Sequence, residues 1–88
     1  MDYEKILQEL RQQYADLEQR AEEGSKEQST YHRIVQLIDQ SSLIKPPLQR
    51  AFIIRISLTT FADATSPEAR PLVNEAISAI TEKARLSP

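Results

Sequence analysis

The sequence predicts an all-α protein, a bundle of three or four helices, on three observations. Apolar side chains recur at helical spacing in four separate segments of the 88-residue chain. Glycine occurs once, and cap residues or prolines precede the later segments. Cysteine is absent, so neither a disulfide nor a sulfur-ligated metal stabilises the chain. We therefore expect one modest core within residues 1–86, and residues 87–88 form a tail or the start of a linker.

The first helix is expected over residues 2–23. Its apolar residues fall at alternating steps of four and three, the a/d spacing of a helix that packs against another helix: Tyr3, Leu7, Leu10, Tyr14, Leu17 and Ala21. Gly24 then fits a C′ cap in the left-handed conformation. At 1.5 Å per residue this helix would be about 32 Å long, longer than those that follow, so its stripe should extend beyond its own domain.

The second helix is expected from residue 26 or 30 to residue 41, because Ser25 and Gln28 have the spacing of a capping box. Three of its apolar residues, Tyr31, Val35 and Ile38, continue the heptad phase of the first helix across Gly24. Two arrangements therefore stay open, a helical hairpin and one continuous helix over residues 2–41. We prefer the hairpin, since glycine inside a helix costs about 1 kcal/mol relative to alanine.

The segment after Pro46 and Pro47 fits two templates equally well. As a helix over residues 47–62 it is apolar nearly all round, whereas residues 52–60 also alternate as a strand and are rich in β-branched side chains. A strand needs a ladder, and no second segment alternates convincingly. We therefore expect a helix, and the strand alternative would imply a sheet shared between molecules.

The last helix is expected over residues 67–85. Ser66 as N-cap, Pro67 at the first helical position and Glu68 in the first turn agree with one another, and Lys83 lies where cations are favoured. Pro71 removes one backbone hydrogen bond at the fifth helical position. Either the first turn is kinked, or the regular helix begins near this proline.

The net charge of −2 conceals a basic middle third. Residues 29–55 hold one acid and four bases, whereas residues 1–28 hold eight acids and four bases. The four bases are dispersed, and the isoelectric point near 5.4 is atypical of nucleic-acid binders. No apolar run reaches the roughly 20 residues of a membrane span, and no signal-peptide pattern opens the chain. We expect a cytoplasmic protein with no membrane partner.

No group of residues indicates a reaction site. His32 is the single histidine, and a catalytic triad or a zinc site needs further ligands that the chain does not supply. Glu18 and Glu22 lie one helical turn apart, but the Asp-rich loop of a calcium site is missing, so a solvated acidic face is expected. A single glycine excludes phosphate-cradling loops. We expect no catalysis, no metal, no cofactor and no small-molecule ligand.

These observations predict a noncatalytic protein–protein interaction or oligomerisation module of the adaptor or effector-recruitment type. Self-association, as a coiled-coil-like dimer, is the preferred mode. The candidate interface residues are Tyr3, Leu7, Leu10, Tyr14, Leu17, Arg50 and Arg55. The two arginines flank the most apolar segment, where they could rim a docking patch or cover core edges with their stems.

The alternative is a small dimeric DNA-binding regulator, with the bases of the middle third on phosphates. These bases are Arg33, Lys45, Arg50 and Arg55. DNA binding is disfavoured because residues 47–62 carry isoleucine and phenylalanine where base-reading polar groups are needed.

Overall fold

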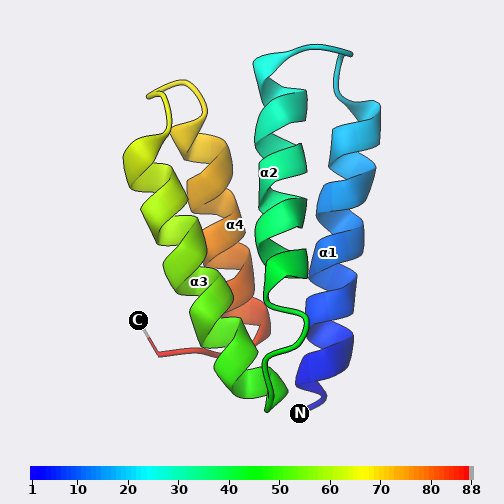
Figure 1. Ribbon diagram of the computed structural model, residues 1–88, viewed down its shortest axis with the longest axis vertical. Helices are drawn as coiled ribbons and strands as arrows, with labels where there is room; N and C mark the ends of the chain where they lie inside the picture. The colour runs from blue at the N-terminus through cyan, green and yellow to red at the C-terminus, as the bar shows by residue number, and fades with distance from the viewer. Residues whose placement is uncertain (88) are drawn as a thin grey trace.

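The computed structural model describes residues 1–87 and consists of four α-helices that run alternately up and down (Figure 1). The helices are α1 (Tyr3–Arg20), α2 (Lys26–Gln40), α3 (Pro47–Ala64) and α4 (Arg70–Lys83). No strand occurs within the described residues, so the predicted helix over residues 47–62 is confirmed. The all-α bundle predicted from the sequence is the observed fold.

The helices form two antiparallel hairpins, α1 with α2 and α3 with α4, and the hairpins pack on each other across a shared core. The chain turns back after α1, so the single continuous helix over residues 2–41 does not form. Every helix contacts the other three, and the bundle measures 35 × 23 × 21 Å. The largest fully buried side chains come from all four helices: Leu10, Ile34, Ile54, Leu58, Val73 and Ile80.

α1 is shorter than predicted and has the same 18-residue length as α3. Its C-cap is Ala21, which has extended backbone dihedral angles. Gly24, with φ of +78°, instead occupies the turn closed by the hydrogen bond from the Ser25 N–H to the Glu22 carbonyl. The predicted C′ position of Gly24 is therefore wrong, although its left-handed conformation is confirmed. The extra length expected of the first helix is absent.

The start of α2 follows the predicted capping box. The Ser25 hydroxyl accepts a hydrogen bond from the Gln28 N–H at 3.0 Å, and the Gln28 side chain accepts one from the Gly24 N–H at 2.8 Å. In the usual capping box the side chain of the third helical residue accepts a hydrogen bond from the N–H of the N-cap residue. Here it accepts one from the N–H of Gly24, the residue before the N-cap. The side-chain bonds therefore fix both the helix start and the preceding turn.

α4 begins later than predicted, at Arg70, after a turn over residues 67–69. Pro71 is then the second helical residue, where no intrahelical N–H bond is lost. The second of the two expectations for this proline is confirmed. At the other end, Arg85 has a φ of +51°, and the Leu86 N–H bonds to the Thr81 carbonyl at 2.9 Å. This Schellman-type ending buries Leu86 and directs the chain toward α3.

Candidate interaction surface

The apolar stripe of α1 lies inside the protein. Leu7, Leu10 and Tyr14 are buried, and Tyr3 and Leu17 are half-buried against the same core. These five predicted interface residues are therefore brought together, but they pack on helices of their own chain. A helix with a single apolar stripe gains most by burying that stripe in its own bundle. The stripe consequently provides no free apolar face.

Tyr14 shows how completely this stripe is enclosed. Its ring lies 6.0 Å from the ring of Tyr31 on α2, at an interplanar angle of 50°. Burial, with a smaller contribution from the charge of Glu75, raises the pKa of Tyr14 to about 12. Burial also raises the pKa of Tyr31. Burial therefore disfavours the ionised form of both hydroxyl groups, which suits packing rather than proton transfer.

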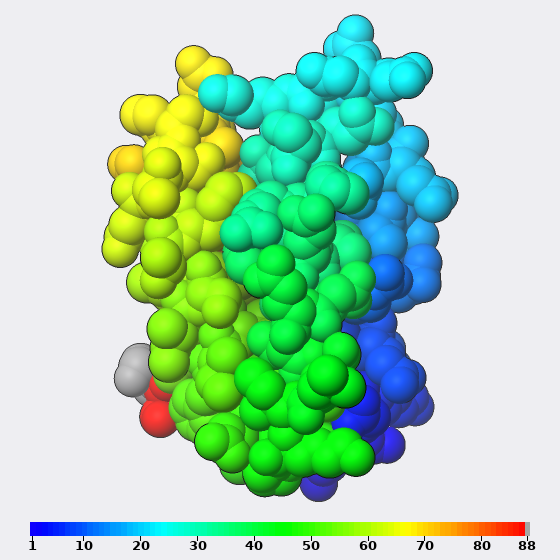
Figure 2. All heavy atoms as spheres, in the orientation of Figure 1, coloured from blue at the N-terminus to red at the C-terminus, as the bar shows by residue number. Residues whose placement is uncertain are grey.

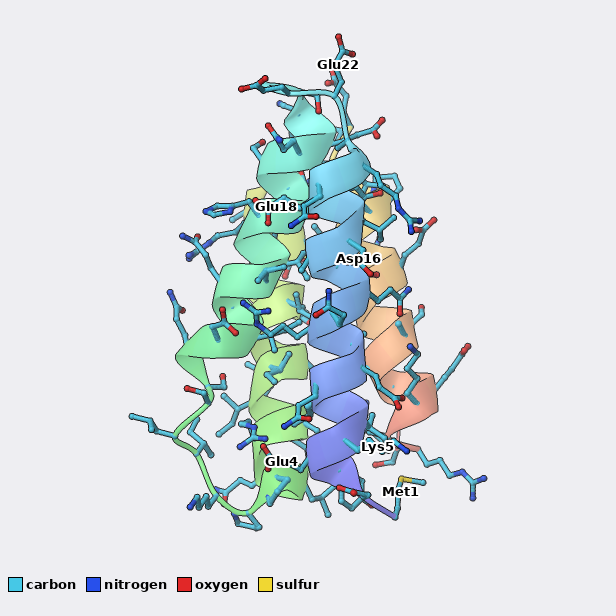
Figure 3. All side chains as sticks on the ribbon, turned by 90° about the vertical axis from the view of Figure 1, so that its right-hand side faces the viewer. Met1, Glu4, Lys5, Asp16, Glu18 and Glu22 are labelled. Carbon is cyan, nitrogen blue, oxygen red and sulfur yellow. The ribbon has the colours of Figure 1, made fainter. Side chains whose placement is uncertain are left out.

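Arg50 is buried, although the sequence suggested a place at an interface rim. Only 5% of the residue is exposed. Its guanidinium donates to the Glu4 carboxylate at 2.6 Å and to the Ser42 and Ile44 carbonyls, each at 3.3 Å. In Figure 3 Glu4 lies at the lower end of α1, beside the start of α3. Arg50 thus ties the α2–α3 connection to α1, a structural role that no sequence pattern indicated.

Arg55 remains on the outer side of α3. Its guanidinium lies 5.3 Å from the ring centroid of Phe52 and donates a hydrogen bond to the Ser87 carbonyl at 2.6 Å. The first contact is a cation–π interaction, and the second holds the end of the described chain against α3. Of the two arginines, Arg55 is the one that lies beside exposed apolar side chains.

α3 carries a second apolar stripe that faces solvent. Leu48, Phe52 and Ile56 are four residues apart and therefore lie above one another on one side of the helix. Leu48 is 37% exposed, Phe52 is half-buried and Ile56 is 64% exposed. We call these three residues the α3 outer stripe. Figure 2 shows the surface of α3 along the left of the molecule with no other helix lying over it.

The opposite side of α3 completes the core. Its buried apolar residues are Ala51, Ile54, Leu58 and Ala62. α3 is therefore apolar on both sides, as its sequence indicated, and only one side is used by the fold. Just before the helix, Leu43 is 91% exposed. Within residues 1–87 the exposed large apolar side chains are Leu43, Leu48, Ile56 and Met1, so most of them belong to this region.

Some polar side chains on the rest of the surface pair with each other. His32 is exposed, and its Nδ1 lies 2.8 Å from a carboxylate oxygen of Glu18. Arg11 of α1 donates to Asp39 of α2 at 2.6 and 3.1 Å, which links the hairpin from outside. In the described part of the chain, no cluster of three or more metal-ligating side chains occurs. An open hollow beside the first turn is lined by Glu18, Gly24, Ser25, Lys26, Gln28, Ser29 and His32.

Two of the four bases of the middle third are engaged within the chain. Arg50 is buried against Glu4, and the guanidinium of Arg55 is hydrogen-bonded to Ser87. Across residues 1–87, no helix is both long enough and apolar enough to cross a bilayer. Comparisons of this chain with protein-family models, characterised proteins and solved structures find no match.

Proposed function

We propose that this protein is a noncatalytic interaction module that self-associates through the α3 outer stripe. The observation that carries the proposal is the exposure of Ile56, 64%, on a helix whose opposite side already fills the core. Contiguous apolar side chains left outside a complete core are typical of protein–protein contact sites. Covering them with a partner removes apolar surface from water, which favours association.

The composition of the stripe and its surroundings supports the same proposal. A ring of Phe52 with Arg55 stacked on it combines the two residue types that are enriched in protein interfaces. Two other exposed residues on this side, Gln49 and Thr59, are uncharged and can lie at a polar rim. This assignment moves the proposed interface from α1 to α3, because the α1 stripe is buried in the core. A cysteine-free chain of this kind suits the cytoplasm, where we place its function.

The test is the solution mass of the wild-type chain and of Ile56→Asp, by sedimentation equilibrium at high micromolar concentration. We expect the wild type to exceed the monomer mass of 10.1 kDa and Ile56→Asp to sediment as the monomer. Asn74→Asp is the matched control, since it adds the same charge at an exposed position of α4. Circular dichroism of all three proteins should show equal helix content. A monomeric wild type, or an Ile56→Asp protein that associates like the wild type, would refute the proposal.

A further inference from the structure

We propose that the partner of the α3 outer stripe is a second copy of this chain, docked antiparallel with Lys45 of each copy against Asp63 of the other. This inference rests on the proposed function and specifies its geometry. The resulting contact is isologous, with a two-fold axis at the level of Ile54.

Opposite charges stand at the two ends of the stripe. Lys45 lies two residues before the first residue of α3, and Asp63 lies in the last turn of the helix. Both side chains are exposed. Among the described residues neither takes part in an ion pair or a side-chain hydrogen bond, in contrast to Arg50, Arg55 and Arg70 of the same region. Each charge is therefore available to a partner.

Two residues of the stripe, Phe52 and Ile56, are related to each other by this axis. In an antiparallel pair, residues of α3 equally far from Ile54 on either side of it face each other. Phe52 then faces Ile56 of the second copy, and Leu48 lies opposite Thr60. Lys45, which precedes the helix, comes to the end of the pair where Asp63 of the second copy lies, and the symmetry axis repeats each contact. Lys45 and Asp63 of one chain lie at opposite ends of α3, whose 18 residues span about 27 Å at 1.5 Å per residue, so they cannot pair within that chain.

The same charges disfavour the parallel arrangement. A parallel pair of α3 helices would place Lys45 beside Lys45 and Asp63 beside Asp63. Like charges facing each other across a helix pair are destabilising, and such charges set partner orientation in coiled coils. The guanidinium of Arg55, which also flanks the stripe, is held by the Ser87 carbonyl and the Phe52 ring. The antiparallel pairing therefore covers Phe52 and Ile56 and brings both terminal charges to opposite charges.

Charge reversal gives a decisive experiment. Lys45→Glu and Asp63→Lys each put like charges at both ends of the homodimer, and we expect each to weaken self-association about tenfold. In a mixture of these two variants, opposite charges face each other again at both ends of the heterodimer. One end pairs the two substituted side chains, and the other end pairs the native Lys45 with the native Asp63. We expect the mixture, and the double variant K45E/D63K, to associate like the wild type in sedimentation equilibrium. Lys5→Glu, an exposed reversal on α1, is the control and should leave association unchanged.

The outcomes separate this inference from the proposed function. Recovery of association in the mixture supports the antiparallel pairing. If Ile56→Asp dissociates the protein but the mixture stays as weak as its components, the α3 stripe is the interface and the Lys45–Asp63 pairing is overturned. A wild type that is monomeric overturns both. As an independent readout, a carbodiimide cross-link between Lys45 and Asp63 in the dimer supports the pairing, and dimers cross-linked only through other residues overturn it.

Discussion

α1 and α3 are equally long and lie in the same bundle, but they use their apolar residues differently. α1 has one apolar stripe, and this stripe is buried among the other helices. α3 has apolar residues on both sides, buries one set and leaves the other exposed. The difference teaches that regular heptad spacing predicts packing but not the partner. A surface for another molecule is expected where a helix has more apolar faces than its own fold can cover.

The two sides of α3 should differ most in what they contribute to stability. Ile54 is 1% exposed and Ile56 is 64% exposed. We expect Ile54→Ala to lower the free energy of unfolding by about 2–5 kcal/mol, because it leaves a cavity in the core. Ile56→Ala should cost under about 1 kcal/mol in the monomer, because its side chain is already largely in water.

Urea denaturation at low protein concentration measures both changes. Because both variants replace isoleucine by alanine within the same helix, helix propensity changes equally in both, and the difference between them reports burial. Equal losses of stability would contradict the distinction between the inner and outer sides of α3.

The two arginines of α3 should also differ in what they contribute to stability, by less than Ile54 and Ile56 do. The buried Arg50 should contribute more than the exposed Arg55. Arg50→Met removes the hydrogen bonds to Glu4 and to two backbone carbonyls of the α2–α3 connection, and we expect a loss of about 2 kcal/mol. Arg55→Met keeps an apolar stem beside Phe52 and should cost under about 1 kcal/mol, because its contacts are exposed. Thermal unfolding of both variants gives the comparison. A larger loss of stability for Arg55→Met than for Arg50→Met would contradict the structural role given to Arg50.

The enclosure of the α1 stripe should be visible as a dependence of stability on pH. The pKa of Tyr14 is about 12 in the folded protein and 10.0 for an unperturbed tyrosine. Below pH 10 the hydroxyl is protonated in both states and contributes nothing. As the pH rises further, the unfolded chain loses this proton first, so stability falls, by about 1 kcal/mol near pH 11.

Urea denaturation of the wild type and of Tyr14→Phe across this range isolates the effect. Tyr14→Phe should lose less stability than the wild type, and the remaining loss includes that from Tyr31, whose pKa is also raised. Parallel losses in the two proteins would show that the Tyr14 hydroxyl is not enclosed.

The starts of α2 and α3 are readable from the sequence, because they depend on local chemistry. Ser25 and Gln28 bond to backbone groups a few residues away, and Pro47 has the φ that the first helical position requires. The end of α1 was misplaced by three residues, since Gly24 served a turn rather than the helix end itself. A lone glycine can indicate a left-handed residue without showing whether that residue ends the helix or lies in a separate turn after it.

The candidate site was less predictable, because it depends on which faces meet in three dimensions. Nothing in the order of residues 47–64 says whether Ile54 or Ile56 points inward, since both sides of the helix are apolar. Arginine is usually exposed, so the burial of Arg50 could not be inferred without the carbonyls of Ser42 and Ile44 that surround it. The regular stripe of α1 therefore draws the interface prediction to that helix, whereas the packing of all four helices leaves the outer stripe of α3 uncovered.

The order of the helices also bears on how quickly the chain reaches its native state. Each helix packs most closely on its sequence neighbour within a hairpin, and the connections between helices are short. Little chain entropy is lost in closing such short loops, and bundles with local contacts fold in microseconds to milliseconds. The core side of α3 is thereby exposed for only a brief time in an incompletely folded chain, which limits the opportunity for aggregation.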